Sequence, residues 1–288
     1  MLHIGKSNDP LEKLRETIDN LRYLETLPPG ANATFSNCHF AKPVSVVPLA
    51  LVGHVKGLTY SNISSYVERM NFPHGEEISG YTNDKSTYFP ITRADLEGLD
   101  NAEMERKLRE LSDKYSSLLD RNIKDHEFKA RIGKNLSKIL ISEMIDNIFE
   151  HSAAQHTFIF SQYYPQSATC EICLVDNGRG IFQSLKSSNR LVISDLDAIQ
   201  QVINHRLSAK DEFGSQHRGT GIRNTIKLLL NRKLQGFFCL ISGAAGFYVD
   251  SKDRRSFLNL QNFNWNGTIV NMGFQKPQTE FDIYEYLR

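Results

Sequence analysis

The sequence has 288 residues, enough for one large domain or two of modest size. Apolar residues make up 40% of it, which favours a folded chain with a sizeable core over wholesale disorder. The 34 basic and 33 acidic residues nearly cancel, so the composition does not indicate a nucleic-acid-binding or membrane-binding protein. No apolar run reaches the ~18 residues of a transmembrane helix, and the first ten residues lack a signal-peptide core. We therefore expect a cytoplasmic protein.

The chain contains four cysteines, and two of them, Cys170 and Cys173, form a CxxC motif. This motif lies in a segment rich in strand-forming residues. Three-residue spacing on a strand sends the two thiols to opposite faces, and no second pair stands at metal-ligand spacing. We expect buried structural cysteines here and not a zinc or redox site.

The N-terminal third of the chain predicts a helix followed by a small mixed α/β domain. Asp9-Pro10 has the form of an N-cap followed by a first-turn proline, and apolar residues then recur at helical spacing up to Leu24. A strand is expected at 33–36, a buried helix at 44–55 and a loop at 71–81. The domain boundaries expected from these patterns are 1–30 for the helix and 31–98 for the small domain.

The remainder, residues 99–288, predicts a single α+β domain. Helices are expected at about 100–120, 124–151, 195–207 and 222–232. Strands are expected at 157–164, 169–175, 236–241, 246–250, 256–260 and 267–274. Helices on one side of a mixed or antiparallel sheet form an α/β sandwich.

The second of these helices carries a polar stripe beside an apolar one. Glu143, Asp146, Asn147 and Glu150 stand at i, i+3, i+4 and i+7 and share one helix face. Taken alone, such a stripe is typical of an ordinary amphipathic helix with its acidic face in water. If it faces a cleft instead, Glu143 can position or deprotonate a water molecule. The Asn147 carboxamide oxygen can then bind Mg²⁺.

The segment Asp176-Asn-Gly-Arg-Gly-Ile181 follows directly after a predicted strand. A carboxylate at a strand end can accept a hydrogen bond from an exocyclic amine such as adenine N6. The glycines at 178 and 180 allow the backbone to approach a flat ligand closely. Asp-Asn-Gly is also a common turn sequence, so the segment alone is weak evidence for a site.

The segment Arg218-Gly-Thr-Gly-Ile222 opens a predicted helix. Backbone N–H groups at a glycine-rich helix N-terminus bind anions, and the helix dipole favours phosphate there. The alternative is a plain loop in which Thr220 caps the helix.

The segment Gly267-Thr-Ile-Val270 lies in a predicted late strand. The Thr268 hydroxyl can share a hydrogen bond with the Asp176 carboxylate, although most strand threonines are simply good strand formers.

The four segments together, in this order and spacing, resemble the motifs of the GHKL ATPases, the class that includes gyrase-type, heat-shock-chaperone, histidine-kinase and mismatch-repair proteins. Glu143 to Asn147 resembles the N box, Asp176 to Gly180 the G1 box and Gly219 to Gly221 the G2 box. The resemblance covers about residues 101–288 and implies the Bergerat fold. The small domain at 31–98, over about residues 32–94, also loosely resembles STAS-like domains, without a diagnostic motif. The G2 segment departs from many members because His217-Arg218 stands where an extra glycine is common.

The resemblance implies a role for each matching residue, with ATP and Mg²⁺ as cofactors. Glu143 would be the catalytic base, Asn147 the Mg²⁺ ligand and Asp176 the adenine-reading carboxylate. The other residues expected at the nucleotide are Gly178, Gly180, Ile181, Arg218, Gly219, Thr220, Gly221 and Thr268. Residues 182–218 would form a mobile lid over the nucleotide.

Three functions remain open on the sequence alone. The first is a slow ATPase that works as a conformational switch, in which ATP closes the lid and reports to the N-terminal domain or to a partner, and Glu143 favours it. A protein partner or a homodimer is expected. The second is a kinase that phosphorylates serine or histidine in a partner, as anti-sigma-factor kinases do. The third is an ATP-sensing module without turnover. His126 superficially resembles a histidine-kinase acceptor but stands only about six helical turns before Asn147, so we interpret it as a surface residue.

Overall fold

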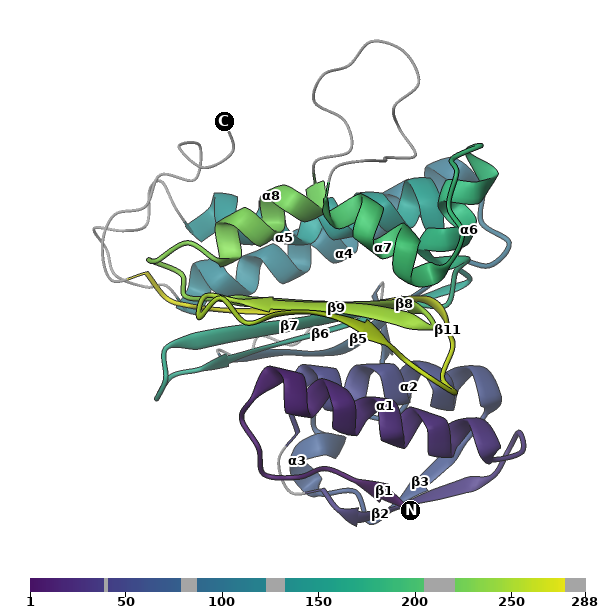
Figure 1. The fold of residues 1–288 in the computed structure, drawn as a ribbon. Coiled ribbons are helices and arrows are strands. Elements are labelled where there is room, and N and C mark those ends of the chain that lie inside the picture. Colours follow the sequence, from purple (N-terminus) through teal and green to yellow (C-terminus); the bar gives the residue numbers. More distant parts are fainter. Residues whose placement is uncertain (39–40, 79–86, 123–132, 205–220, 278–288) are drawn as a thin grey trace.

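The computed structural model describes residues 1–38, 41–78, 87–122, 133–204 and 221–277, and it shows an α+β protein with three layers (Figure 1). An eight-stranded sheet forms the middle layer. Helices from the C-terminal part of the chain cover one face of this sheet. The N-terminal segment, which includes a separate three-stranded sheet, covers the other face. None of the helices in the described ranges is both long and apolar enough to cross a lipid bilayer.

The large sheet is antiparallel except at one edge, where β4 and β5 run parallel. In spatial order its strands are β10 (Arg255–Asn259), β9 (Ala245–Asp250), β8 (Phe237–Gly243), β11 (Trp265–Gln275), β7 (Thr169–Asp176), β6 (His156–Tyr164), β5 (Tyr88–Asp95) and β4 (Glu76–Glu77). The long closing strand β11 is inserted between β8 and β7. This topology therefore places Thr268 of β11 directly opposite Asp176 of β7.

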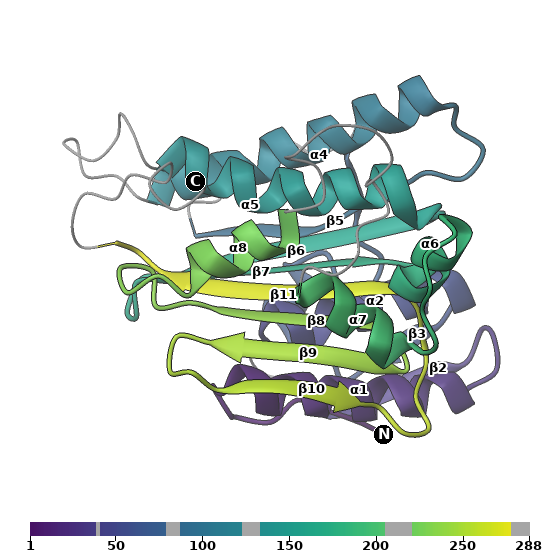
Figure 2. The same ribbon diagram turned by 45° about the horizontal axis from the view of Figure 1, so that its top comes forward.

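The helical face of the sheet is covered by elements from residue 101 onwards (Figure 2). They are α4 (Asn101–Asn122), α5 (Gly133–Asn147), the π-helix η2 (Ile148–Ser152), α6 (Gly180–Ser187), α7 (Asp195–Ile203) and α8 (Gly221–Leu229). Their apolar residues pack on one side of the strands, with Tyr115, Leu140 and Leu228 fully buried in this core. The Tyr115 hydroxyl also lies 2.7 Å from the carbonyl oxygens of Pro90 and Ile159 and shares its one proton between them, which fixes α4 on β5 and β6.

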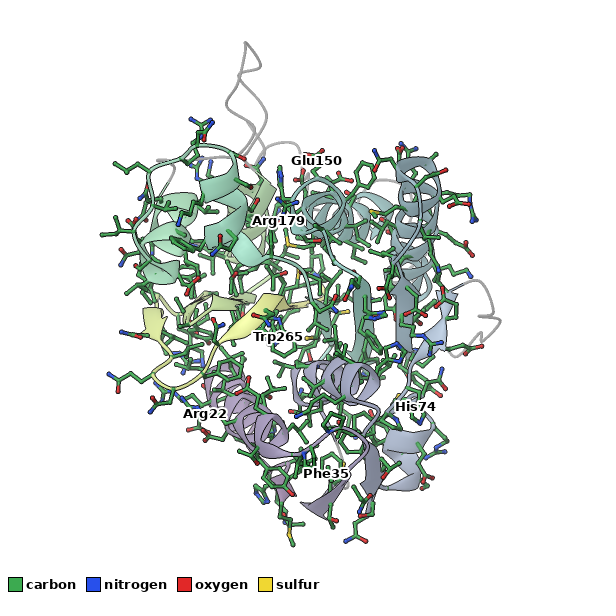
Figure 3. The ribbon with its side chains drawn as sticks, turned by 90° about the vertical axis from the view of Figure 1, so that its right-hand side faces the viewer. Arg22, Phe35, His74, Glu150, Arg179 and Trp265 are labelled. Carbon is green, nitrogen blue, oxygen red and sulfur yellow. The ribbon has the colours of Figure 1, made fainter. Side chains whose placement is uncertain are left out.

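The N-terminal layer covers the other face of the sheet (Figure 3), where Phe35 marks this layer and Trp265 marks the sheet. It consists of β1 (Leu2–His3), α1 (Pro10–Thr26), β2 (Asn32–Asn37), α2 (Pro43–Lys56), β3 (Thr59–Ser61) and α3 (Ser65–Glu68). The three strands form a parallel sheet in the order β1-β2-β3. As the sequence predicts, the Asp9 carboxylate caps α1 by accepting from the backbone N–H groups of Leu11 and Glu12.

This layer and the sheet share one continuous apolar core. Residues of α1 and α2 such as Leu21 and Val47 are buried in the same cluster as Phe158 and Val175 of the sheet. A buried ion pair crosses the same interface, since Lys42 Nζ, at the start of α2, lies 2.7 Å from Glu171 Oε1 on β7.

The strands and helices of the C-terminal part lie close to their predicted positions, with two differences. The segment predicted as one helix over 124–151 is helical from residue 133, and its last turn is the π-helix η2; residues 123–132 lie outside the described ranges. The helix α6 was not predicted, and it overlaps the start of the segment 182–218 that was expected to be a lid. The boundary expected at 98/99 also does not separate two sheets, because β4 and β5 pair with the C-terminal strands.

The expected burial of the cysteines is confirmed. Cys38, Cys170, Cys173 and Cys239 are all buried free thiols. Cys170 belongs to the core on the helical side of the sheet and Cys173 to the core on the N-terminal side, so the CxxC thiols point to opposite faces.

Candidate active site

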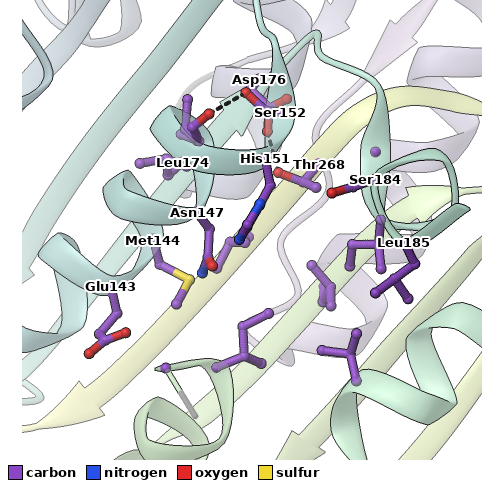
Figure 4. A pocket seen from close by; sticks show the side chains of 18 of the residues that line it. Glu143, Met144, Asn147, His151, Ser152, Leu174, Asp176, Ser184, Leu185 and Thr268 are labelled. Carbon is purple, nitrogen blue, oxygen red and sulfur yellow. Dashed lines mark hydrogen bonds between the residues drawn. The ribbon is translucent and has the colours of Figure 1, made fainter. Parts of the chain in front are cut away.

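A cavity lies between the sheet and the helices that follow residue 132 (Figure 4). Strands β7, β8 and β11 form its floor, and α5, η2, α6, α7 and α8 contribute its walls. Its lining residues are Glu143, Met144, Asn147, Ile148, His151, Ser152, Leu174, Asp176, Gly180, Ile181, Ser184, Leu185, Val202, Gly221, Ile222, Arg223, Leu240, Thr268 and Val270. Most of this surface is apolar, and a few polar groups stand at fixed places within it, which is typical of a small-molecule site.

Asp176 stands at the last position of β7 and is fully buried. Its Oδ1 atom accepts a hydrogen bond of 2.8 Å from the Gly178 backbone N–H, and its Oδ2 atom accepts one from the Thr268 hydroxyl. The contact with Thr268 is the one expected from the sequence. Burial raises the pKa of Asp176 to about 6, although the hydrogen bonds from Thr268 and Gly178 lower it in part. A carboxylate with a raised pKa in a cleft is typical of a functional group.

The turn after Asp176 fits only glycine at position 178. A Cβ atom there would lie 2.3 Å from the carbonyl oxygen of Ser152 and 2.8 Å from Asp176 Oδ1. The Arg179 N–H donates to the same Ser152 carbonyl at 2.7 Å. The turn is therefore packed directly on the end of the π-helix η2. Single π-turns of this kind are common at functional sites.

Two further glycines hold the same corner of the cavity. Gly180 has a φ of +70°, and Gly267 has a φ of +109° with a would-be Cβ only 2.1 Å from the Asp176 carbonyl oxygen. Ser242 links the two segments, since its hydroxyl accepts from the Ile181 N–H at 2.8 Å and donates to the Gly267 carbonyl at 3.1 Å. Ser242 could not be predicted from the sequence, because a serine within an apolar strand carries no signal of such a contact.

Glu143 and Asn147 line the cavity from α5, one helical turn apart. Figure 4 shows Glu143 at one end of the cavity and Asp176 at the other, with Asn147 and His151 between them. Asp146 and Glu150, the other members of the polar stripe, are exposed. The stripe is therefore divided, with half of it facing the cavity and half facing solvent.

Gly221, the first residue of α8, lies against the Glu143 carboxylate. A Cβ atom at position 221 would be 2.0 Å from Glu143 Oε2. The structure thus brings together eight of the predicted site residues: Glu143, Asn147, Asp176, Gly178, Gly180, Ile181, Gly221 and Thr268. Arg218, Gly219 and Thr220 lie outside the described residues. His151 and Ser152 also line the cavity and were not among the residues predicted from the sequence.

The arrangement offers different chemistry at its two ends. The buried carboxylate and hydroxyl of Asp176 and Thr268 can recognise a hydrogen-bond donor on a flat, largely apolar ligand. The Asn147 amide oxygen is a ligand of the type that Mg²⁺ accepts, and the Glu143 carboxylate can serve as a base beside it. No protein-family model, curated protein or solved structure matches this chain.

Proposed function

We propose that this protein binds Mg²⁺-ATP in the cavity, in the manner of the GHKL ATPases, and hydrolyses it slowly as a conformational switch. The observation that carries this proposal is the order of the polar groups along one cavity, from Asp176 through Asn147 to Glu143. That order matches a nucleotide with its base at Asp176 and its phosphates toward Gly221. The fold under this proposal is the Bergerat sandwich.

The adenine end is supported by the state of Asp176. The carboxylate accepts from the Gly178 backbone N–H and from the hydroxyl and backbone N–H of Thr268, and an ionised carboxylate has about four acceptor sites, so acceptor capacity remains for the N6 amine. The pKa of about 6 leaves the group mainly ionised at neutral pH. The neighbouring apolar side chains Ile148, Leu174 and Val270 provide surface for the faces of a purine ring.

The phosphate end is supported by the position of Gly221 at the start of α8. A helix N-terminus offers free N–H groups and a positive dipole end, both of which favour a phosphate. Glu143 adjoins this helix start, so a water molecule held by its carboxylate would stand near a terminal phosphate. Asn147 would complete the Mg²⁺ coordination together with water and phosphate oxygens.

The proposed conformational switch is supported by strand β7, which lines the cavity on one face of the sheet and packs against the N-terminal layer on the other. Asp176 ends the strand β7, whose residues Cys173 and Val175 are buried in the core formed with the N-terminal layer. A shift of β7 on nucleotide binding would reach α1 and α2 through that core. The output would pass to a protein partner or to a second copy of the chain.

The test is to incubate the protein with Mg²⁺ and ATP labelled at the γ-phosphate, comparing wild type with Glu143→Ala. We expect free phosphate from the wild type and a rate at least about a hundredfold lower in the variant, with ATP binding retained. Asp146→Ala is the matched control, because Asp146 is acidic, lies on the same helix and is exposed outside the cavity. Its rate should stay within about twofold of the wild-type rate.

If the label from the γ-phosphate is retained on this chain or on a protein from cell extract, the protein is a kinase and not an ATPase. Equal loss of phosphate release in both variants would contradict the role of Glu143. ATP binding with no release of phosphate by the wild type would leave a nucleotide sensor.

A further inference from the structure

Two histidines and one aspartate meet where α2 packs on the sheet, outside the cavity described above. His54 lies in the last turn of α2, Asp95 ends β5 and His156 begins β6. Strands β5 and β6 are antiparallel, and their register places Asp95 opposite His156. The three side chains therefore come from three separate elements that the fold holds rigidly together.

The potential ligand atoms of these residues face one another. His156 Nδ1 lies 2.9 Å from Asp95 Oδ1, and His54 Nε2 lies 3.7 Å from the same oxygen. All three ligand atoms lie within 4.8 Å of one another. In a tetrahedral zinc site with bonds of about 2.0–2.1 Å, neighbouring ligand atoms are about 3.3–3.4 Å apart. The distances of 2.9 and 3.7 Å from Asp95 Oδ1 lie on either side of this value. Small rotations of the side chains would therefore bring the ligand atoms to the spacing of a zinc site.

The surroundings of Asp95 leave one of its oxygens for the histidines. Arg93 Nε donates to Asp95 Oδ2 at 2.9 Å, and Oδ1 faces the two imidazole rings. Arg93 is fixed in turn by hydrogen bonds from its Nη1 atom to the carbonyl oxygens of His74 and Gly75 at 3.1 and 3.0 Å. Outer groups that orient a carboxylate in this way are a regular part of metal sites.

The neighbouring positive charges are compensated by a further carboxylate. Glu77 Oε2 lies 3.6 Å from Arg93 Nε, and Glu77 Oε1 lies 2.5 Å from Lys107 Nζ. The charges of Arg93 and Lys107 are thereby paired, so they oppose the approach of a cation less than unpaired charges would.

The cluster is also accessible from solvent. The side chains of His54, Asp95 and His156 are 26%, 34% and 17% exposed. A metal ion can therefore enter without unfolding of the chain, and a water molecule can take a fourth position. Two imidazoles and one carboxylate with one open position is a ligand set that suits Zn²⁺.

We propose that His54, Asp95 and His156 form a zinc site that fastens α2 of the N-terminal layer to strands β5 and β6. The site stands on different residues from the ATP cavity, so it does not rest on the proposed function. Bound Zn²⁺ replaces the present contacts of Asp95 Oδ1 with the two imidazole rings by coordinate bonds to three elements. It thereby stabilises the contact between the two parts of the chain.

The test uses the full chain, stripped of metal with a chelator and then titrated with Zn²⁺ by calorimetry and with Co²⁺ by visible absorption. We expect one Zn²⁺ per chain and the absorption bands of tetrahedral Co²⁺. His54→Ala should weaken zinc binding at least tenfold and abolish the cobalt bands. His3→Ala is the matched control, because His3 is exposed on β1, away from the cluster, and this variant should bind like the wild type.

Thermal unfolding provides a second readout that also reports whether each variant is folded. Zn²⁺ should raise the melting temperature of the wild type and of His3→Ala, and leave that of His54→Ala unchanged. A wild type that binds no Zn²⁺ would overturn the proposal and leave a hydrogen-bonded His–Asp cluster. Equal affinity in His54→Ala, or equal loss in both variants, would also overturn it, because the metal would then sit elsewhere on the surface.

Discussion

The two faces of the large sheet are packed in different ways. On the N-terminal face, side chains such as Phe158, Phe160 and Tyr248 are fully buried against α1 and α2 in a continuous core. On the helical face, the strands carry a similar core at one side and a cavity at the other. That cavity contains the buried carboxylate of Asp176 and a turn that fits only glycine at position 178.

This difference indicates which features of the sheet serve stability and which serve binding. An apolar core is stabilised by every side chain it buries. A buried carboxylate whose pKa is raised to about 6 is ionised at neutral pH, and its charge is then less stable in the fold than it would be in water. A fold that contains such a destabilising group is best explained if the carboxylate binds a ligand. We therefore assign ligand binding to the cavity face of the sheet.

Truncation on the N-terminal face should have the largest effect on stability. Phe158→Ala removes a fully buried ring beneath α2 and leaves a cavity in the shared core. We expect the free energy of unfolding to fall by about 3–5 kcal/mol, measured by urea denaturation. A fall of less than about 1 kcal/mol would show that the N-terminal layer is only loosely attached to the sheet.

On the cavity face, a substitution at Asp176 is expected to raise the free energy of unfolding instead of lowering it. Asp176→Asn removes the charge and keeps the shape, and the amide can still accept from Gly178 and donate to Thr268. The folded-state pKa of Asp176 is about 6 against an ordinary value of 3.8. Its raised pKa therefore contributes stability that is complete below about pH 3.8 and is lost as the pH rises through about 6.

The side chain of Asp176→Asn stays uncharged at every pH, so this variant does not lose stability as the pH rises. Since one pKa unit corresponds to about 1.4 kcal/mol, its free energy of unfolding at pH 7 should exceed that of the wild type by up to about 3 kcal/mol. The difference should shrink toward zero at pH 4. Urea denaturation at the two pH values measures it, and a variant less stable than the wild type at pH 7 would contradict the account of Asp176.

A smaller and more selective effect is expected at Asn147. Asn147→Ala should weaken ATP binding about tenfold when Mg²⁺ is present, because one oxygen ligand of the metal is lost. In EDTA the affinity should equal that of the wild type. Fluorescence titration with a labelled ATP analogue under both conditions measures this. Equal weakening in EDTA would assign Asn147 to the nucleotide itself or to the fold.

Much of the fold could be predicted from local patterns. Leucine spacing and an Asp-Pro cap are sufficient to locate α1, and alternating strand formers locate the four strands that end the described chain. Long-range packing could not be predicted in this way. Nothing in residues 76–95 indicates that β4 and β5 join the large sheet, because β5 is placed there by its pairing with β6, which is distant in sequence, and β4 by its pairing with β5. The sequence does contain a local indication of the short helix α6, because the apolar residues Ile181 and Leu185 stand four residues apart, which is the spacing of one helix face.

The same distinction between local patterns and long-range packing applies to the residues of the candidate site. Asp176, Asn147 and Glu143 could be selected because each belongs to a motif of fixed spacing. Ser242 could not be selected, because its role depends on two backbone groups from other segments. The His54, Asp95 and His156 cluster carries no sequence signal either, since its members come together only through the docking of α2 and the register of β5 with β6.

The most direct test of the central claim is the equilibrium binding of ATP and of GTP to the wild type and to Asp176→Ala, by calorimetry with Mg²⁺. We predict that the wild type binds ATP at least tenfold more tightly than GTP, because Asp176 accepts a hydrogen bond from an exocyclic amine at the purine 6-position. The variant should lose this preference and most of its affinity for ATP. A wild type that binds neither nucleotide, or a variant whose ATP affinity is unchanged, would contradict the assignment of the cavity as an ATP site.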